Sequence, residues 1–209
     1  MNSNILIREM NKEDLENVVI IHNKAFPYYF MTHLGNRFLY HYYATFLNSN
    51  HSLSLVSEEK GNITGFVVGP HKSLEHKKEA IKYLSLRLIP IILYKLIFSP
   101  GVIAHILLRF GQTIRILVKE PKAPPSSLPE PRALLASIAV SKKARLGTGI
   151  SLINEFTKRM KELGTGCVIT STDSDNKAAK RAFLHSNFKL LDQKCIEGRM
   201  IERYIFVCK

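Results

Sequence analysis

Tryptophan is absent from this sequence of 209 residues, and cysteine occurs only three times. Cys167, Cys195 and Cys208 are odd in number and form no CxxC pair. Such spacing gives no support to a disulfide framework or to a metal held by cysteines. We therefore expect no metal cofactor and three reduced, buried thiols, which are typical of cytoplasmic proteins. The stretch "MNSNILIREM" also lacks the apolar core of a signal peptide, so the sequence predicts a cytoplasmic location.

A long uninterrupted apolar run is missing as well. The most apolar stretch, residues 83–118, is interrupted by Arg87, Pro90, Lys95 and Pro100. A membrane-spanning helix needs roughly 20 consecutive apolar residues, and no run here reaches that length. The sequence predicts no transmembrane segment, and contact with a membrane surface stays open.

Acidic residues are scarce: 17 Asp and Glu stand against 30 Lys and Arg, which gives a formal charge of +13. This excess favours an anionic partner, such as a nucleotide, a nucleic acid or an acidic membrane surface. RNA-binding aromatic motifs, zinc-finger spacing and a lysine tail are all absent, so we expect no nucleic-acid partner. The charge is concentrated in residues 71–119, which hold nine basic and two acidic residues.

Apolar periodicity predicts an α/β protein with a mixed sheet. In the first helix, Asn11 is the expected N-cap, and an apolar face carries Leu15, Val18, Val19 and His22. Strands are expected at 4–10, 133–140, 167–172, 188–196 and 199–209, a hairpin at 52–70 around Lys60-Gly61-Asn62, and helices at 11–26, 32–47, 149–163 and 175–185. Residues 71–119 read as one helix that continues through Pro90 to Phe98 and another from Val102 to Lys119.

The stretch "SIAVSKKARLGTGISLINEFTKRM", residues 137–160, places a strand, a basic turn with two glycines and a helix start in succession. Main-chain N–H groups at a helix N-terminus favour an anion, and glycine lets the backbone approach it closely. The turn lacks the GxxxxGK[ST] pattern of a P-loop. The two glycines alone are more often found in a tight strand-to-helix connection with a solvated basic edge. A phosphate-binding site is the second interpretation of this turn.

A second motif, "DSDNKAAKRAFLHSNF", follows the next expected strand. Asn176, Ala179, Phe183 and Phe188 give the pattern N-x-x-A-x-x-x-F-x-x-x-x-F. Together the two motifs, about residues 137–188, resemble the GNAT superfamily of acyl-CoA-dependent N-acyltransferases. That family has a (Q/R)xxGx(G/A) turn between strand and helix, and an NxxAxxxYxxxGF helix after the next strand. The resemblance implies a GNAT-like mixed central sheet flanked by helices, in one domain over 1–209, and acetyl-CoA as acyl donor.

The resemblance also implies site residues. The strand would pair with the pantetheine arm, the turn would bind the pyrophosphate through main-chain N–H groups, Asn176 would contact pantetheine or cap its helix, and Phe183 would lie beside the thioester sulfur. The residues matched to acyl-CoA binding are Ile138, Ala139, Val140, Arg145, Leu146, Gly147, Thr148, Gly149, Ile150, Asn176 and Phe183. The alternatives are helix capping alone for Asn176 and core packing alone for Phe183.

Three positions depart from the family pattern. Ala144 stands at the Q/R position, with Arg145 one residue later, so the turn is expected to be rearranged. Phe183 replaces a tyrosine often assigned as the acid that protonates the leaving thiolate, and phenylalanine has no proton to give. Asn187 replaces a glycine, and asparagine can also adopt the left-handed conformation.

Acyl transfer to an amine needs a general base and a donor for the oxyanion, and a strand N–H near Val140 could supply the donor. The family's acceptor loop corresponds to "AFPYYFMTHLGNRF", residues 25–38, where Tyr28, Tyr29 and His33 cluster. We take His33 and Tyr29 as candidate catalytic residues, because a histidine titrates near neutral pH. Core packing or stacking is the alternative for each.

The pattern FP…LG..FL..YY in this loop is also similar to a subgroup of GNAT-type enzymes found with bacterial surface-polysaccharide and nucleotide-sugar genes. That similarity implies an amino-sugar nucleotide, or another anionic small amine, as acceptor. Residues 71–132 would then be a basic helical insertion between the third and fourth strands. It could cover the acceptor, form a homodimer contact, or bind the inner face of a membrane through residues 71–119. A packed elaboration with a solvated basic face is the plain alternative.

Other hypotheses stay open beside the enzyme. A catalytically silent relative would bind acyl-CoA as a sensor or scaffold. Phe183 and the lack of an obvious carboxylate base are consistent with this hypothesis. A peptide or protein N-terminus is the rival acceptor. A charge-driven binder of membranes or nucleic acid would show salt-sensitive binding and no affinity for coenzyme A.

Overall fold

The computed structural model describes residues 5–98, 128–196 and 198–208. The chain divides into two compact units, residues 1–80 with 129–209 and residues 81–128. The first unit contains two four-stranded sheets, and every candidate site residue belongs to it.

The first sheet has the order β1-β2-β3-β5 and is antiparallel throughout. Its strands are β1 (Leu6–Glu9), β2 (Ser52–Glu59), β3 (Asn62–Pro70) and β5 (Ser137–Val140). The predicted hairpin is confirmed, because β2 and β3 pair directly around the turn. Lys60 and Gly61, at the centre of that turn, have φ values of 52° and 76°, and two successive positive φ angles are what a type I′ turn requires.

The second sheet has the order β4-β6-β8-β7, with β4 parallel to β6 and the other pairs antiparallel. Its strands are β4 (Arg132–Leu134), β6 (Cys167–Asp173), β7 (Lys189–Ile196) and β8 (Arg199–Val207). The strands after the second motif are therefore confirmed as a hairpin. The cysteine prediction is wrong in part, since Cys167 is buried but Cys195 is exposed and Cys208 lies between the two.

The single strand predicted over residues 133–140 is wrong. The Leu135 N–H donates to Ile169 O at 2.9 Å in the second sheet, and the Ala136 N–H donates to Val68 O at 2.9 Å in the first. The chain thus changes sheets between these two residues, and β5 separates from β6. "ALLASIAV" is apolar except for Ser137, so its pattern could not show where the hydrogen-bonding partner changes.

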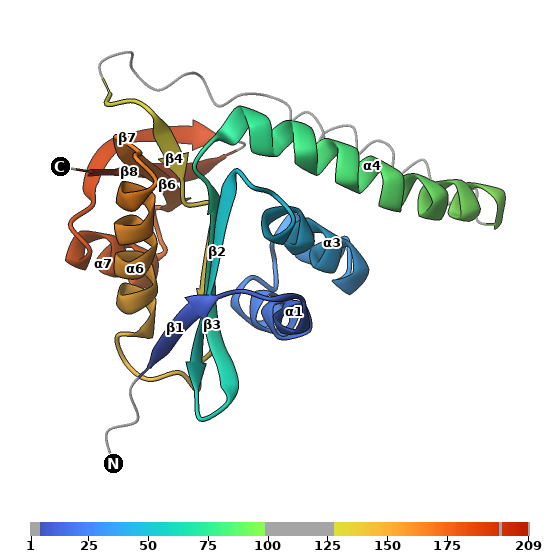
Figure 1. The fold of residues 1–209 in the computed structure, drawn as a ribbon, viewed down its shortest axis with the longest axis horizontal. Helices are drawn as coiled ribbons and strands as arrows, with labels where there is room; N and C mark the ends of the chain where they lie inside the picture. The colour runs from blue at the N-terminus through green and yellow to red at the C-terminus, as the bar shows by residue number, and fades with distance from the viewer. Residues whose placement is uncertain (1–4, 99–127, 197, 209) are drawn as a thin grey trace. The chain divides into compact units, whose positions relative to one another are not determined.

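The helices of the first unit lie on both faces of the first sheet (Figure 1). α1 (Leu15–Ala25) and α3 (Asn36–Leu47) cover one face, and α6 (Thr148–Glu162) covers the other, with α7 (Lys177–His185) packed beside α6. The apolar sides of α6 and α7 pack with residues of both sheets in one core. This core fixes β5, β6 and α7, the elements that surround the candidate site.

The helix predicted over residues 32–47 is two helices. α2 (Phe30–His33) ends before Gly35, and α3 starts at Asn36. Gly35 has a φ of 91°, a conformation that interrupts a helix and that glycine adopts at little cost. The predicted helix start at residue 149 is also one residue late, because α6 begins at Thr148.

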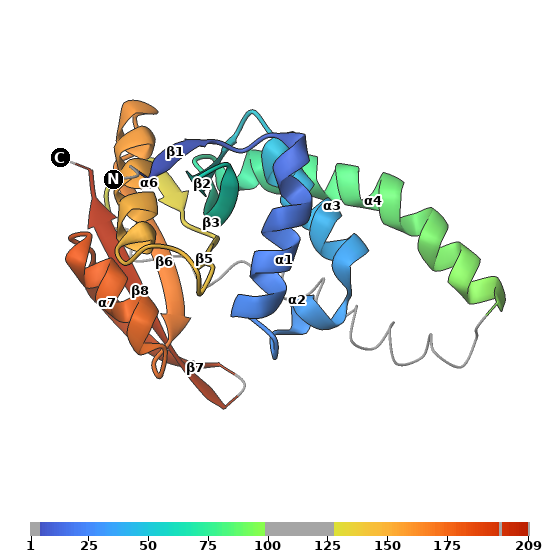
Figure 2. The ribbon, with the colours of Figure 1, turned by 90° about the horizontal axis from the view of Figure 1, so that it is seen from below.

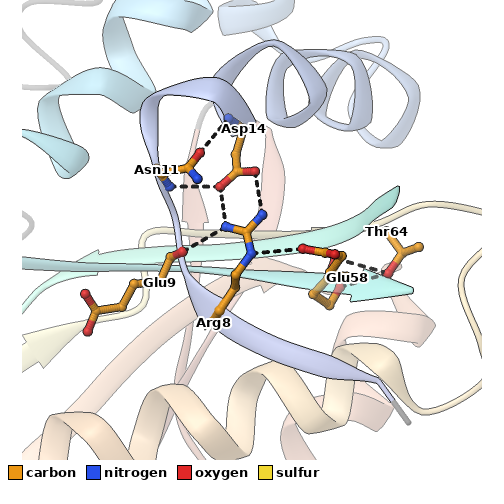
Figure 3. A network of polar contacts seen from close by, with 7 residues as sticks. Arg8, Glu9, Asn11, Asp14, Glu58 and Thr64 are labelled. Carbon is orange, nitrogen blue, oxygen red and sulfur yellow. Dashed lines mark hydrogen bonds and ion pairs between the residues drawn. The ribbon is translucent and has the colours of Figure 1, made fainter. Parts of the chain in front are cut away.

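The start of α1 is held by a charged network (Figure 3). Arg8 on β1 donates to both carboxylate oxygens of Asp14 at 2.7 and 2.9 Å and to Glu58 on β2 at 2.9 Å. Asn11 and Asp14 cap each other in a capping box ahead of a short 3₁₀ turn, η1 (Lys12–Asp14). Burial would raise the pKa of Asp14, but the Arg8 hydrogen bonds outweigh it and hold that pKa below its usual range. The network therefore ties the start of the first helical segment to two strands. Asn11 is confirmed as a cap, but of η1, which leads directly into α1.

The segment between β3 and β4 is a basic insertion with helical structure, as predicted. Its described helix, α4 (Ser73–Phe98), continues through Pro90. The second predicted helix, over residues 102–119, lies outside the described residues. Within the part of the chain that the structure describes, no helix combines the length and the apolar composition needed to cross a bilayer. The predicted single domain over 1–209 with an insertion at 71–132 stays a prediction.

Candidate active site

A cavity lies where β5 and β6 separate, in the first unit of the chain. In Figure 2, α1 and α2 lie on one side of β5, and β6 with α7 lies on the other. The cavity volume is about 180 Å³, enough for the reactive end of a ligand rather than for a whole coenzyme. The residues that line it are His22, Phe26, Tyr29, Met31, Tyr42, Tyr43, Leu135, Ala136, Ser137, Ile138, Thr170, Ser171, Thr172, Asn176, Ala179 and Phe183.

β5 is an edge strand beside this cavity. It pairs with β3 from Ser137 to Val140, and within the described residues no strand pairs with its other edge. Ser137 and Ile138 line the cavity, while Ala139 is 6% exposed and packs inward. An unpaired strand edge presents main-chain N–H and C=O groups that an extended ligand can bind. The predicted residues Ile138, Ala139 and Val140 thus lie on this strand, and Ile138 among them lines the cavity.

The basic turn runs from β5 into the N-terminus of α6, as predicted. Gly147 is the N-cap of α6, with a left-handed φ of 93°, and a Cβ built there would meet nothing within 4 Å. The side chains of Arg145 and Leu146 are exposed, whereas Thr148 is fully buried. Of the remaining predicted residues, Gly149 and Ile150 are half-buried in the first turn of α6. The turn is therefore open on its outer side and anchored on its inner side.

A carboxylate occupies part of this turn, which sequence reasoning missed. Glu59, at the end of β2, accepts from the Arg145 N–H at 3.1 Å and from the Thr148 hydroxyl at 3.3 Å. At the predicted pyrophosphate site, the Glu59 carboxylate thus already occupies one main-chain donor, the Arg145 N–H. Glu59 is 86 residues from Arg145 in the sequence, and nothing in "SEEKGN" indicates this contact.

The second motif provides the opposite wall. Asn176 is the N-cap of α7 and accepts from the Ala179 N–H at 3.1 Å. Phe183 is 2% exposed and packs against Phe188, with ring centroids 5.6 Å apart. Both Asn176 and Phe183 also line the cavity. Asn176 is thus a helix cap and Phe183 a core residue, and both are at the same time part of the cavity wall. Asn187, where the family pattern has glycine, has a φ of 62°, which confirms the expected left-handed conformation.

Three polar side chains deep in the cavity form a hydrogen-bonded chain. His22 Nδ1 lies 2.6 Å from the Tyr43 hydroxyl, which lies 3.1 Å from Ser137 Oγ. Tyr43 is fully buried and His22 is 4% exposed. Burial lowers the pKa of His22 to about 4 and raises that of Tyr43 well above its ordinary value. Both groups are therefore neutral at physiological pH.

Sequence analysis placed His22 on the apolar face of the first helix and did not select it as a site residue. A histidine among core positions is the only signal that could have marked it. Its partners come from 21 residues further on and, through Tyr43, from a strand another 94 residues away, so the pattern within one helix cannot reveal the chain.

At the rim of the cavity, Tyr29 donates to Asp173 at 2.5 Å, and Arg199 donates to both oxygens of the same carboxylate. Burial and the bond to Asp173 raise the pKa of Tyr29 to about 12. Burial alone would raise the pKa of Asp173, but the bonds from Arg199 and Tyr29 lower it. Tyr29 is thus a protonated donor rather than a base at neutral pH.

The structure does not bring the two predicted catalytic residues together. Tyr29 lines the cavity, but His33, at the end of α2, is exposed and is not among the lining residues. Tyr28 is 90% exposed. Tyr29 is the extended N-cap of α2, whereas His33 is the last residue of this single-turn helix, so proximity in sequence does not place these side chains in one site. Within the described residues, no group of three or more His, Cys, Asp or Glu side chains forms a metal site.

Comparison with family models and with curated proteins finds no match to this sequence. Solved structures do match its fold. An N-acetyltransferase from Staphylococcus aureus Mu50 aligns with a TM-score of 0.61 at 18% identity, covering 99% of this chain and 100% of that chain. A ribosomal-protein-alanine N-acetyltransferase from Brucella melitensis aligns with a TM-score of 0.62 at 16% identity, covering 97% and 99%.

A third similar structure, yncA from Salmonella typhimurium, is a proposed acetyltransferase solved with its cofactor acetyl-CoA. It aligns with a TM-score of 0.57 at 15% identity and covers 100% of this chain and 95% of that chain. At these identities the likeness shows the fold. The chain has the fold of the GNAT-type N-acetyltransferases, with a basic helical insertion between its third and fourth strands.

Proposed function

We propose that this protein is an acyl-CoA-dependent N-acyltransferase that transfers an acetyl or other short acyl group to the primary amine of a small acceptor. The observation that carries the proposal is the edge of β5 that no strand pairs with in the described parts of the chain. This edge borders the cavity, and β5 leads directly into the turn at the start of α6. The neighbour from Salmonella typhimurium, whose structure contains acetyl-CoA, supports the same donor.

The residues present fit such a donor. Ile138, Ala139 and Val140 offer strand-edge main-chain groups to an extended pantetheine arm. The turn from Arg145 to Ile150 offers N–H groups at the N-terminus of a 15-residue helix, where an anion is favoured. Lys142 and Lys143 are exposed beside it and add positive charge. Asn176 and Phe183 border the cavity from α7, where the thioester end would lie.

The chemistry proposed is direct attack by the neutral amine on the thioester carbonyl, with a base to accept the amine proton. A main-chain N–H of β5 would stabilise the oxyanion. Phe183 cannot protonate the departing thiolate. Tyr29 already donates its proton to Asp173, so the Tyr29, Asp173 and Arg199 group is better suited to positioning an acceptor at the rim.

For the acceptor, we propose an anionic small amine such as an amino-sugar nucleotide, because the chain carries a formal charge of +13. A peptide N-terminus is the rival acceptor class, and the neighbour from Brucella melitensis is named for an alanine residue of a ribosomal protein. We also propose that the insertion contacts an anionic membrane surface or forms a homodimer. Both proposals rest only on the positive charge of residues 71–119.

The experiment is release of free thiol from acetyl-CoA, measured with a panel of amines: amino-sugar nucleotides, free amino sugars, and short peptides with a free alanine or serine N-terminus. Amine-dependent release supports the enzyme, and the class of amine that reacts identifies the acceptor. Tight binding of acetyl-CoA without release for any amine would support the sensor or scaffold instead. The absence of any binding would overturn the proposal.

A further inference from the structure

We propose that His22, Tyr43 and Ser137 form a proton relay that takes the proton from the acceptor amine and returns one to the departing thiolate. The inference rests on the proposed function and assigns to this cavity the base and the acid that the family motif lacks here. His22 and Ser137 are catalytic residues in this scheme, and Tyr43 joins them.

The three side chains come from α1, α3 and β5, and all of them line the cavity. His22 Nδ1 is 2.6 Å from the Tyr43 hydroxyl, and that hydroxyl is 3.1 Å from Ser137 Oγ. Both distances are within hydrogen-bonding range. A hydroxyl has one proton to donate and lone pairs to accept with, so Tyr43 can accept from one neighbour while it donates to the other.

The His22 end of the hydrogen-bonded chain is a buried nitrogen, Nε2, for which the described residues provide no hydrogen-bond partner. The His22 side chain is only 4% exposed. A buried polar atom without a partner costs free energy, so such an atom in a residue that lines a cavity is a candidate for contact with a ligand. His22 lines the cavity on α1, the helix that leads into the loop containing Tyr29, which is the acceptor side of the proposed site.

The direction of the relay follows from the chemistry. The amine must lose a proton, so Nε2 must be the bare nitrogen, and Nδ1 then carries the hydrogen that it donates to Tyr43. Tyr43 in turn donates to Ser137. Burial disfavours the imidazolium ion, and therefore a proton accepted at Nε2 must be matched by one that leaves from Nδ1.

The step balances. The amine nitrogen bonds to the acyl carbon, the carbon–sulfur bond breaks, and its electron pair stays on sulfur. The amine proton moves to Nε2, the Nδ1 proton to the Tyr43 oxygen, the Tyr43 proton to Ser137, and the Ser137 proton to sulfur. The products are an amide and free coenzyme A thiol. Exchange with solvent water after product release restores the starting tautomer.

This relay would account for two features at once. Phe183 stands where the family pattern often has an acidic tyrosine, and a hydroxyl on β5 gives the thiolate another proton donor. The buried Nε2 gives the amine an acceptor, although no carboxylate lines the cavity among the described residues. Structural hydrogen bonding alone would explain the Tyr43 contacts but would leave Nε2 without a purpose.

The first test is the tautomer of His22 in the purified full chain, read from its ¹⁵N chemical shifts at pH 7. The relay requires a protonated Nδ1 and a bare Nε2. A protonated Nε2 in the free protein would overturn the proposal, because the amine proton would then have no acceptor. This measurement needs no acceptor substrate.

The second test compares turnover of the same amine panel in Tyr43→Phe, which removes one oxygen, with that in Tyr40→Phe on the same helix. Tyr40 is not among the cavity-lining residues, so Tyr40→Phe should leave turnover unchanged. Tyr43→Phe should lower kcat about 10²-fold, the scale of general acid–base catalysis, with acetyl-CoA affinity within about twofold. The solvent deuterium isotope effect on kcat should report several moving protons in the wild type and fewer in Tyr43→Phe.

Ser137 provides a second pair of variants in case Tyr43→Phe unfolds. Ser137→Ala should lose turnover to a similar degree, and Ser137→Thr, which keeps the hydroxyl, should retain most of it. Unchanged kcat in a folded Ser137→Ala or Tyr43→Phe overturns the relay while the enzyme reading stands. If the wild type binds no acetyl-CoA, the proposed function and the relay are overturned together. Calorimetric titration with acetyl-CoA therefore distinguishes failure of the relay alone from failure of the proposed function.

Discussion

Lowering the pH from 7 to 5 should reduce the free energy of unfolding through His22. Burial lowers the pKa of His22 from its ordinary value of 6.5 to about 4. Folding therefore favours the neutral imidazole, and this contribution is complete above pH 6.5 and is lost as the pH falls towards 4. Proton linkage between these two pKa values gives a loss of about 2 kcal/mol between pH 7 and pH 5. His76, whose pKa burial also lowers to about 4, should add a loss of the same sign.

Urea unfolding of the wild type and of His22→Gln at pH 7 and pH 5 measures this effect. The variant loses the buried imidazole and its 2.6 Å contact with the Tyr43 hydroxyl, so its stability should be lower at both pH values. Its decrease between the two pH values, however, should be smaller than that of the wild type by about 2 kcal/mol. His33→Gln is the matched control, because His33 is exposed, and its pH dependence should equal that of the wild type.

Equal pH dependence in the wild type and in His22→Gln would refute the reasoning. It would mean that the imidazole is solvated or paired in solution and is not held neutral by burial. The cavity would then lack the neutral histidine on which the relay depends.

Two further substitutions test the close approach of β3 to β4 and the role of the turn before α6. Gly69→Ala should destabilise the fold by about 3 kcal/mol or more, because a Cβ there would lie 1.8 Å from Leu134 O. The control is Gly149→Ala, whose Cβ would make an ordinary contact of 3.5 Å and should change stability by less than about 1 kcal/mol. Thermal unfolding of both variants measures the difference. An unchanged melting temperature in Gly69→Ala would mean that the sheets do not approach so closely. Glu59→Gln removes a negative charge but keeps an acceptor for the Arg145 N–H, so acetyl-CoA affinity should rise about threefold at low salt and less at high salt. Weaker binding in calorimetry would contradict the placement of the phosphates at this turn.

Local signals made much of the fold predictable. Asn11 was identifiable as a cap because its hydrogen-bonding partner lies three residues away. Lys60-Gly61 marked a tight turn because two positive φ angles limit the residues that fit. Asn176 was predictable in the same way, as a cap that bonds three residues ahead. In each of these cases the contact that decides the structure lies within a few residues.

The missed features depend on distant contacts. The change of sheet after Leu135 is fixed by hydrogen-bonding partners in β3 and β6, which a mostly apolar run cannot specify. The bonds of Glu59 to the turn and of His22 to Tyr43 join residues on separate elements. His33 was selected for its chemistry and its nearness in sequence to Tyr29. The short helix α2 lies between the two residues, and only Tyr29 lines the cavity among this pair.

Calorimetric titration of acetyl-CoA into the wild type, Gly147→Glu and Gly164→Glu tests the central claim most directly. Both glycines have positive φ angles, 93° and 76°, and a Cβ at either would meet nothing within 4 Å. Gly147 caps the N-terminus of α6, whereas Gly164 follows its C-terminus at Glu162. The two substitutions thus impose similar backbone strain but place the negative charge at opposite ends of the helix.

The account predicts binding by the wild type, similar binding by Gly164→Glu, and binding more than about tenfold weaker in Gly147→Glu, since a like charge would occupy the pyrophosphate site. No binding by the wild type, or equal binding by all three proteins, would contradict the claim that the cavity and the turn of this chain hold acyl-CoA.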